Sequence, residues 1–103
     1  MDVEYLSKYR ANLYNRKNMF HVYILISKKD KKTYLGSTNN LKRRISKHNK
    51  GKTSSTKNRR PLELIYKEEL DLLSKARKRE KYLKSRKGRR ELKEIFKKLD
   101  IGS

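Results

Sequence analysis

Apolar residues recur at every second position directly after Met19. One set is Phe20, Val22, Ile24 and Ile26, and the positions between them hold His21, Tyr23, Leu25 and Ser27. A period of two places alternate side chains on opposite faces of a β-strand. Residues 28–32 are polar and suit a turn, after which residues 33–36 return as a second strand. The pattern therefore predicts an antiparallel hairpin.

A helix and a loop are expected after the hairpin. Asn39 or Asn40 can cap a helix that runs to about Asn49, and Gly51 can close it. Residues 52–61 are polar and basic and end in a proline, which is typical of a loop.

The second half begins with an extended segment and continues in helices. Residues 62–67 alternate again and predict a third strand. Asp71 or Ser74 can cap a second helix that runs to about Ser85, and a basic joint, Lys84–Arg90, follows. The third helix is indicated by an apolar stripe at Leu92, Ile95, Phe96 and Leu99. This order of elements predicts an α+β fold, a small sheet with helices packed against it.

The N-terminal segment differs from the rest of the chain. Leu6, Tyr9 and Leu13 stand at roughly helical spacing in residues 1–18, so this basic arm is expected to be helical or flexible. Residues 19–99 are expected to form one domain, and residues 100–103 a short tail.

The net charge of the chain indicates the kind of partner that it binds. The chain of 103 residues carries 31 Lys and Arg against 11 Asp and Glu, a formal net charge of +20. Repulsion at this charge disfavours a compact fold unless a polyanion is nearby, which indicates nucleic acid. A membrane-surface binder or a disordered arm would also be basic, but the periodic apolar runs favour a folded core.

Several common features are missing from the sequence. It has no cysteine, so disulfides and thiolate metal sites are excluded. The longest apolar run, residues 22–26, is too short to cross a bilayer. There is no signal peptide and no glycine-rich phosphate loop. We therefore expect a cytoplasmic protein, associated with the nucleoid if bacterial, with no membrane contact and no small-molecule cofactor.

Two side chains of the first helix could carry chemistry. Leu41 and Ile45 mark its buried side, and Arg44 and His48 lie four residues apart at the edge of that side. Arg44 could equally be a solvated charge, and His48 a structural or exposed histidine.

The second helix has a carboxylate in its apolar stripe. Glu80 lies four residues after Ala76 and three before Leu83. Burying a carboxylate is costly unless it is paired or bound to a cation. Glu80 is therefore either paired with an Arg or Lys, or a ligand of Mg²⁺, which prefers oxygen donors.

The hairpin supplies two tyrosines, Tyr23 and Tyr34. If both side chains share a face of the sheet, two phenol groups project into one place. Tyrosines are common in strands and usually pack as core, so each alone is interpreted as structural.

These residues belong to a longer ordered set. The hairpin contains Val22-Tyr23-Ile24 and Tyr34-Leu35-Gly36. A second segment runs from Gly36 through Arg44, and His48 follows one helical turn later. Two further segments run from Arg59 through Tyr66 and from Ala76 through Lys84. The set resembles the GIY-YIG nuclease family over roughly residues 20–98. The short stand-alone bacterial members are the most similar, and they are related to the N-terminal nuclease domain of the excision-repair endonuclease and to intron homing endonucleases. His21 stands where the family signature has glycine.

The resemblance implies a three-stranded antiparallel sheet flanked by about three helices. It also implies catalytic roles for five residues, with Mg²⁺ or Mn²⁺ bound by the glutamate: Tyr23, Tyr34, Arg44, His48 and Glu80. Tyr23 or His48 would relay the proton of the attacking water, and the sequence leaves that choice open.

Other polar residues are candidates for contacts with the nucleic-acid backbone. Such contacts fix position without reading sequence. The candidates are Arg43, Lys47, Lys52, Ser55, Thr56, Lys57, Arg59, Arg60, Arg86, Lys87, Arg89 and Arg90.

The function expected on this basis is a metal-dependent endonuclease that hydrolyses DNA phosphodiester bonds and that could be selective for DNA structure, with branched DNA among its possible substrates. Duplex DNA and RNA are further possible partners. The alternative is a DNA- or RNA-binding module that keeps the fold with little or no activity, since the late Asn of many relatives has no equivalent after Glu80. A ribosome-associated basic protein is a third hypothesis, which no motif supports.

Overall fold

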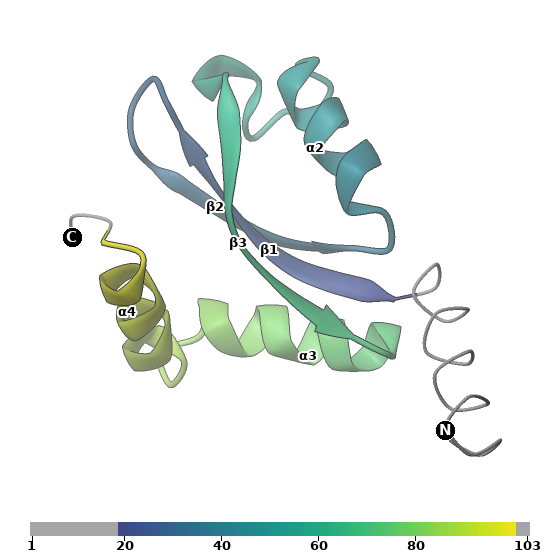
Figure 1. Ribbon diagram of the computed structural model, residues 1–103, viewed down its shortest axis with the longest axis vertical. Coiled ribbons are helices and arrows are strands. Elements are labelled where there is room, and N and C mark those ends of the chain that lie inside the picture. The colour runs from purple at the N-terminus through teal and green to yellow at the C-terminus, as the bar shows by residue number, and fades with distance from the viewer. Residues whose placement is uncertain (1–18, 101–103) are drawn as a thin grey trace, which may run out of the picture.

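The computed structural model describes residues 19–100 as a three-stranded sheet with helices on both faces (Figure 1). The predictions for the N-terminal arm and for the last three residues lie outside the described residues. The elements in chain order are β1 (Phe20–Ser27), β2 (Thr33–Thr38), α2 (Leu41–Asn49), the 3-10 turn η2 (Lys57–Arg59), β3 (Leu62–Leu70), α3 (Leu73–Lys84) and α4 (Arg89–Lys98).

The sheet has the order β2-β1-β3, and both pairings are antiparallel. The central strand β1 pairs with β2 in unbroken register, in which Tyr23 lies opposite Gly36. Its pairing with β3 shifts between Ile24 and Leu25. The predicted α+β fold with a three-stranded antiparallel sheet is confirmed.

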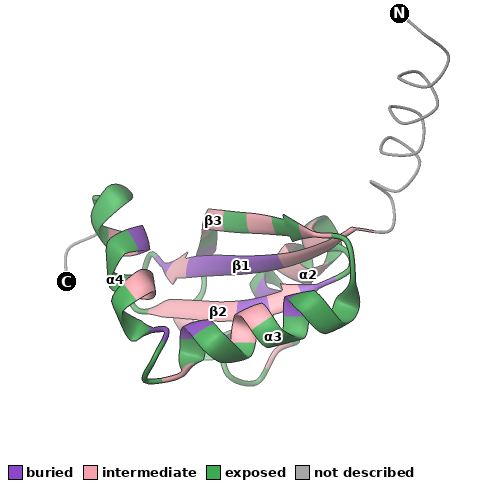
Figure 2. Ribbon diagram, turned by 90° about the horizontal axis from the view of Figure 1, so that it is seen from below, coloured by how far each residue is buried: buried purple, intermediate pink, exposed green. Residues whose placement is uncertain are grey.

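Both faces of β1 are buried, as its alternation predicts. Val22 and Ile24 pack with residues of α3 and α4, whereas Tyr23 and Leu25 pack towards α2. Figure 2 shows β1 as an almost continuous buried strand between elements with exposed outer surfaces. Burial of one such side chain contributes about 1.5–3 kcal/mol, so this strand anchors both layers.

The helix α2 begins and ends where its sequence predicts. The side chain of Asn40 accepts a hydrogen bond from the Arg43 amide, which caps the first turn. Gly51 follows the last turn with a φ of 76°, a conformation that glycine adopts without steric cost. Leu41 and Ile45 pack on the face of the sheet that holds Tyr23.

The start of α3 was predicted wrongly. The residue at the N-cap is Leu72, with no side-chain hydrogen bond, rather than Asp71 or Ser74. Asp71 instead pairs with Lys75 at 3.0 Å. The loop after α2 also contains η2, and β3 continues to Leu70, beyond the predicted strand.

Within residues 19–100, no helix is both long enough and apolar enough to span a membrane.

Candidate active site

Two tyrosines meet on the α2 face of the sheet. The ring centroids of Tyr23 and Tyr34 are 6.2 Å apart. Tyr23 reaches over its cross-strand partner Gly36, where an added Cβ would lie 2.7 Å from the Tyr23 hydroxyl. A glycine is therefore required opposite Tyr23, and the two phenol groups share a face as the sequence suggested.

His48 is fully buried and joins Tyr23 to Thr56. Its Nε2 lies 3.1 Å from the Tyr23 hydroxyl, and its Nδ1 lies 2.8 Å from Oγ1 of Thr56. The Thr56 hydroxyl lies 3.5 Å from the carbonyl oxygen of Thr53, to which it donates. With Thr56 donating to Thr53, its oxygen can accept from a proton on Nδ1 of His48, and in that tautomer Nε2 accepts the Tyr23 hydroxyl proton. The ring of Tyr34 stands edge-on to His48 at 4.8 Å.

The electrostatic environment favours the neutral forms of both Tyr23 and His48. Burial, together with the charges of Arg44 and Lys47, lowers the pKa of His48 below its ordinary value. Burial also raises the pKa of Tyr23, and the neighbouring Tyr34 adds to this. At neutral pH, Tyr23 is therefore a protonated donor and His48 a neutral acceptor.

Arg44 is half-buried beside these groups. Its charge acts on the pKa values of Tyr23, His48 and Glu80. Arg44 forms no ion pair with any of residues 19–100. Its guanidinium can therefore donate to an incoming anion.

Glu80 reaches the edge of the sheet from α3. The Ser37 hydroxyl donates to Oε1 at 2.5 Å, and the Lys84 ammonium donates to Oε2 at 2.6 Å. Burial opposes ionisation, but these two donors, with the charges of Lys84 and Arg44, outweigh it and lower the pKa of Glu80. The pairing with a basic residue that the sequence allowed is present, and the carboxylate is ionised.

The donor set fits a weakly held hard cation. No cluster of three or more His, Asp or Glu side chains suitable for a metal exists between residues 19 and 100. Glu80 is a single ionised carboxylate whose side chain is 24% exposed. Mg²⁺ commonly keeps several waters and binds through one or two carboxylates plus substrate phosphates. Glu80 is therefore sufficient for such an ion but not for a closed protein cage.

Most of the candidate nucleic-acid contacts are exposed. These are Arg43, Lys47, Lys52, Ser55, Lys57, Arg60, Arg86, Lys87, Arg89 and Arg90. Arg59 differs, because its Nε donates to Asp30 at 3.2 Å. The prediction that Thr56 offers a surface hydroxyl is wrong, because Thr56 is fully buried against His48.

Sequence reasoning missed three residues around the site. Thr56 orients His48, while Ser37 and Lys84 bind Glu80. Lys84 lies four residues after Glu80, so helical spacing could have revealed it. No comparable local signal exists for Ser37, which lies 43 positions before Glu80.

The chain is similar in sequence to a family model and to several known proteins. A family model described as the GIY-YIG catalytic domain matches residues 19–93. A UPF0213 protein of Staphylococcus saprophyticus is 38% identical over 76 residues, which cover 73% of this chain and 93% of that protein. The UPF0213 protein YazA of Bacillus subtilis is 39% identical over 77 residues, or 74% of this chain and 76% of that protein. No solved structure matches the chain significantly.

Proposed function

The chain belongs to the GIY-YIG family, and from that premise we propose that it is a Mg²⁺-dependent endonuclease that hydrolyses DNA phosphodiester bonds. The catalytic domain of the family implies a nuclease that acts on nucleic acid. The choice of DNA and the internal cut are specific to the proposal. Its main support is the hydrogen-bonded chain from Tyr23 through His48 to Thr56, next to an Arg44 without an ion pair.

The proton path follows from this chain of hydrogen bonds. Hydrolysis needs a water that loses a proton as it attacks phosphorus. Tyr23 can accept that proton while its own hydroxyl proton moves to Nε2 of His48. Tyr23 therefore never has to become a free phenolate. That form is unfavourable because burial raises the pKa of Tyr23. Tyr23 is thus the group that meets water, and His48 is the group that stores the proton.

Thr56 and Arg44 complete the charge balance. When His48 becomes an imidazolium, its Nδ1–H still donates to Thr56, which holds the ring in place. Arg44 donates to the non-bridging phosphate oxygens as their negative charge grows. Tyr34, packed edge-on to His48, limits the movement of both rings and orients the water or the phosphate.

Glu80 is the residue that would hold the metal. Bound there, Mg²⁺ or Mn²⁺ would neutralise charge on the phosphate and steady the leaving oxygen. Ser37 and Lys84 keep the carboxylate ionised and fix its orientation.

A nucleic-acid-binding module with little or no activity is the second candidate. One observation favours it: Lys84 already neutralises the single carboxylate of the site, so Glu80 is satisfied without a metal. In that case the basic surface would bind DNA or RNA, and Tyr23 and His48 would serve only the core.

A cleavage panel distinguishes the two candidates. Supercoiled plasmid, linear duplex, flap, junction, single-stranded DNA and RNA are incubated with the protein, with Mg²⁺, with Mn²⁺ or with a chelator. We expect cleavage that requires the metal, and Glu80→Gln should reduce it by about 100-fold or more while binding of the same substrates persists.

Glu94→Gln is the matched control for Glu80→Gln. Glu94 is an exposed glutamate on α4, so its replacement changes the net charge equally. Unchanged cleavage by Glu80→Gln would refute the proposed metal site. Binding without cleavage of any substrate by the wild type would establish the binding module instead.

A further inference from the structure

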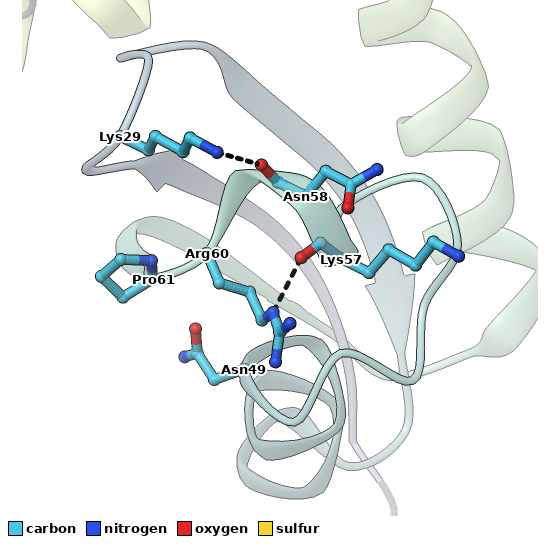
Figure 3. A pocket seen from close by; sticks show the side chains of 6 residues that line it. All are labelled: Lys29, Asn49, Lys57, Asn58, Arg60 and Pro61. Atoms are coloured by element: carbon cyan, nitrogen blue, oxygen red, sulfur yellow. Dashed lines mark hydrogen bonds between the residues drawn. The ribbon is translucent and has the colours of Figure 1, made fainter.

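A basic pocket lies beside the turn that holds His48. It is formed where the β1–β2 turn, the end of α2 and the loop before β3 meet, and its volume is about 480 Å³ (Figure 3). The lining residues are Lys29, Asn49, Lys57, Asn58, Arg60 and Pro61.

The pocket concentrates positive charge that no carboxylate neutralises. Three of its six lining residues, Lys29, Lys57 and Arg60, are cationic and none is acidic. In the part of the chain that the structure describes, these three form no ion pair, whereas the neighbouring Arg59 is paired with Asp30. Their charge is therefore available to a ligand.

Backbone contacts hold two of these cations in place. The Lys29 ammonium donates to the Asn58 carbonyl at 3.3 Å, and Nε of Arg60 donates to the Lys57 carbonyl at 2.7 Å (Figure 3). Gly51 makes room for Arg60, since an added Cβ there would lie 2.8 Å from the guanidinium. The two terminal nitrogens of Arg60 stay free, in the forked arrangement that suits phosphate.

The walls of the pocket are also fixed. Asn49 binds the start of β3 twice, since its amide donates to the Leu62 carbonyl at 3.0 Å and accepts from the Leu62 amide at 2.8 Å. Between lining residues Asn58 and Arg60, the chain is held by Arg59, whose carbonyl accepts from the Ser27 hydroxyl at 2.6 Å. The pocket is thus formed before any ligand binds, which lowers the entropy cost of binding.

We propose that this pocket binds one phosphate group of the nucleic-acid substrate, outside the reaction centre. The proposal rests on the proposed function, in that nucleic acid is the partner. Arginine and lysine are the side chains that recognise phosphate, and three of them line this pocket with no acidic residue among the lining. The group is either an internal phosphodiester or a terminal phosphate of a strand.

The pocket and the reaction centre share one turn. Lys57 follows Thr56, and the amides of both donate to the Thr53 carbonyl, at 2.9 and 3.1 Å. Thr56 contacts His48 at 2.8 Å. A phosphate bound in the pocket would therefore lie next to the turn that orients His48.

The test compares two charge-matched double variants of the full chain. Lys29→Gln/Lys57→Gln removes two pocket cations, and Lys93→Gln/Lys97→Gln removes two exposed cations of α4, which lies on the opposite side of the sheet from η2 (Figure 1). Binding of a fluorescent oligonucleotide is measured by anisotropy over a range of salt, with a chelator present. Thermal unfolding checks that both variants fold.

We expect the pocket variant to lose about tenfold in affinity beyond the control, and its salt slope to fall by about 0.7 for a single strand. Titration with inorganic phosphate should shift the amide signals of Lys57, Asn58 and Thr56 to saturation in the wild type and not in the pocket variant. Equal losses in both variants, with no saturable phosphate shift, would overturn the proposal.

Two further comparisons identify whether the bound phosphate is internal or terminal, and they distinguish phosphate binding in the pocket from the nuclease activity. A 5′-phosphorylated strand that binds more tightly than its unphosphorylated form, only with the pocket intact, identifies a terminal phosphate; equal binding identifies an internal one. No measurement here needs cleavage. If no substrate is cleaved but the pocket variant alone loses affinity, the nuclease proposal is refuted and the phosphate pocket is supported. If substrates are cleaved but the pocket and control variants lose affinity equally, the phosphate pocket is refuted and the nuclease proposal is supported.

Discussion

The sheet is covered by α2 on one face and by α3 and α4 on the other (Figure 1), and each face has a partly buried arginine with different partners. On the α3–α4 face, Arg79 donates to Glu68 at 2.7 and 2.9 Å and also to both carboxylate oxygens of Glu91. On the α2 face, Arg44 forms no ion pair with any described residue, and its neighbours Tyr23 and His48 are neutral.

Arg79 therefore has a structural role, whereas the charge of Arg44 is available to a ligand. The donors of Arg79 are directed at two carboxylates, so this arginine has little left to offer a ligand. On the α2 face, Arg44 has no ion-pair partner among the described residues and lies beside a proton acceptor, so its guanidinium is available to an incoming anion. The comparison predicts that replacing Arg44 changes activity, whereas replacing Arg79 changes stability.

The largest effect is expected from Arg44→Gln. Removing a donor to the charge that grows on the phosphate should lower kcat by about 10²–10³-fold. The free energy of unfolding should stay the same or rise slightly, because no ion pair is lost. Single-turnover cleavage and urea unfolding measure the two quantities.

Lys42→Gln is the control for Arg44→Gln, since it removes one exposed charge from the same helix. If both variants lose activity equally, Arg44 acts only through net charge, and the contrast between the two faces fails.

The opposite outcome is expected from Arg79→Gln. Glu68 and Glu91 would lose their shared partner, and breaking a buried pair costs up to several kcal/mol. The side chains of Arg79 and Glu68 are 23% and 20% exposed, so solvent screening reduces the loss to about 1–3 kcal/mol. The activity of the folded fraction should change little.

Urea unfolding of Arg79→Gln and of the exposed neighbour Lys78→Gln provides the check. If Arg79→Gln loses activity although it is fully folded, the Arg79 network contributes to activity and not only to stability, contrary to the comparison.

Local patterns were sufficient to predict the sheet and the helix that carries Arg44 and His48, whereas the five candidate residues were grouped as one site only by the family resemblance. The period of two in β1 sorts Val22 from Tyr23, and both faces follow from it because each strand residue points opposite to its neighbour. The cap at Asn40 sets the start of α2, and with it the direction of Arg44 and His48.

Contacts between distant segments could not be predicted in this way. Ser37 meets Glu80 only because α3 packs along the edge strand β2, which no spacing in the sequence encodes. Thr56 looked like a polar loop residue, yet the turn at Thr53 folds it inward onto His48. The start of α3 was misplaced because Asp71 pairs with Lys75 instead of capping the helix.

The smallest effect on the α2 face is expected from Thr56→Val, which tests how His48 is held. Valine keeps the volume of threonine but cannot accept the Nδ1–H, so the ring loses the partner that fixes its tautomer. The Nε2–H tautomer, which cannot accept from Tyr23, then becomes populated. One lost hydrogen bond of about 1–1.5 kcal/mol corresponds to about a tenfold fall in kcat, with KM little changed.

Nitrogen chemical shifts of His48 distinguish this tautomer change from a general loosening of the core. Because burial lowers the pKa of His48, the ring is neutral at pH 7 in both proteins, so the shifts report the tautomer alone. Thr56→Ser retains the hydroxyl and should restore both the Nδ1–H form and most of kcat. If Thr56→Val lowers kcat without a tautomer change, or if Thr56→Ser fails to restore it, then Thr56 only fills space, and the proton path through His48 loses its support.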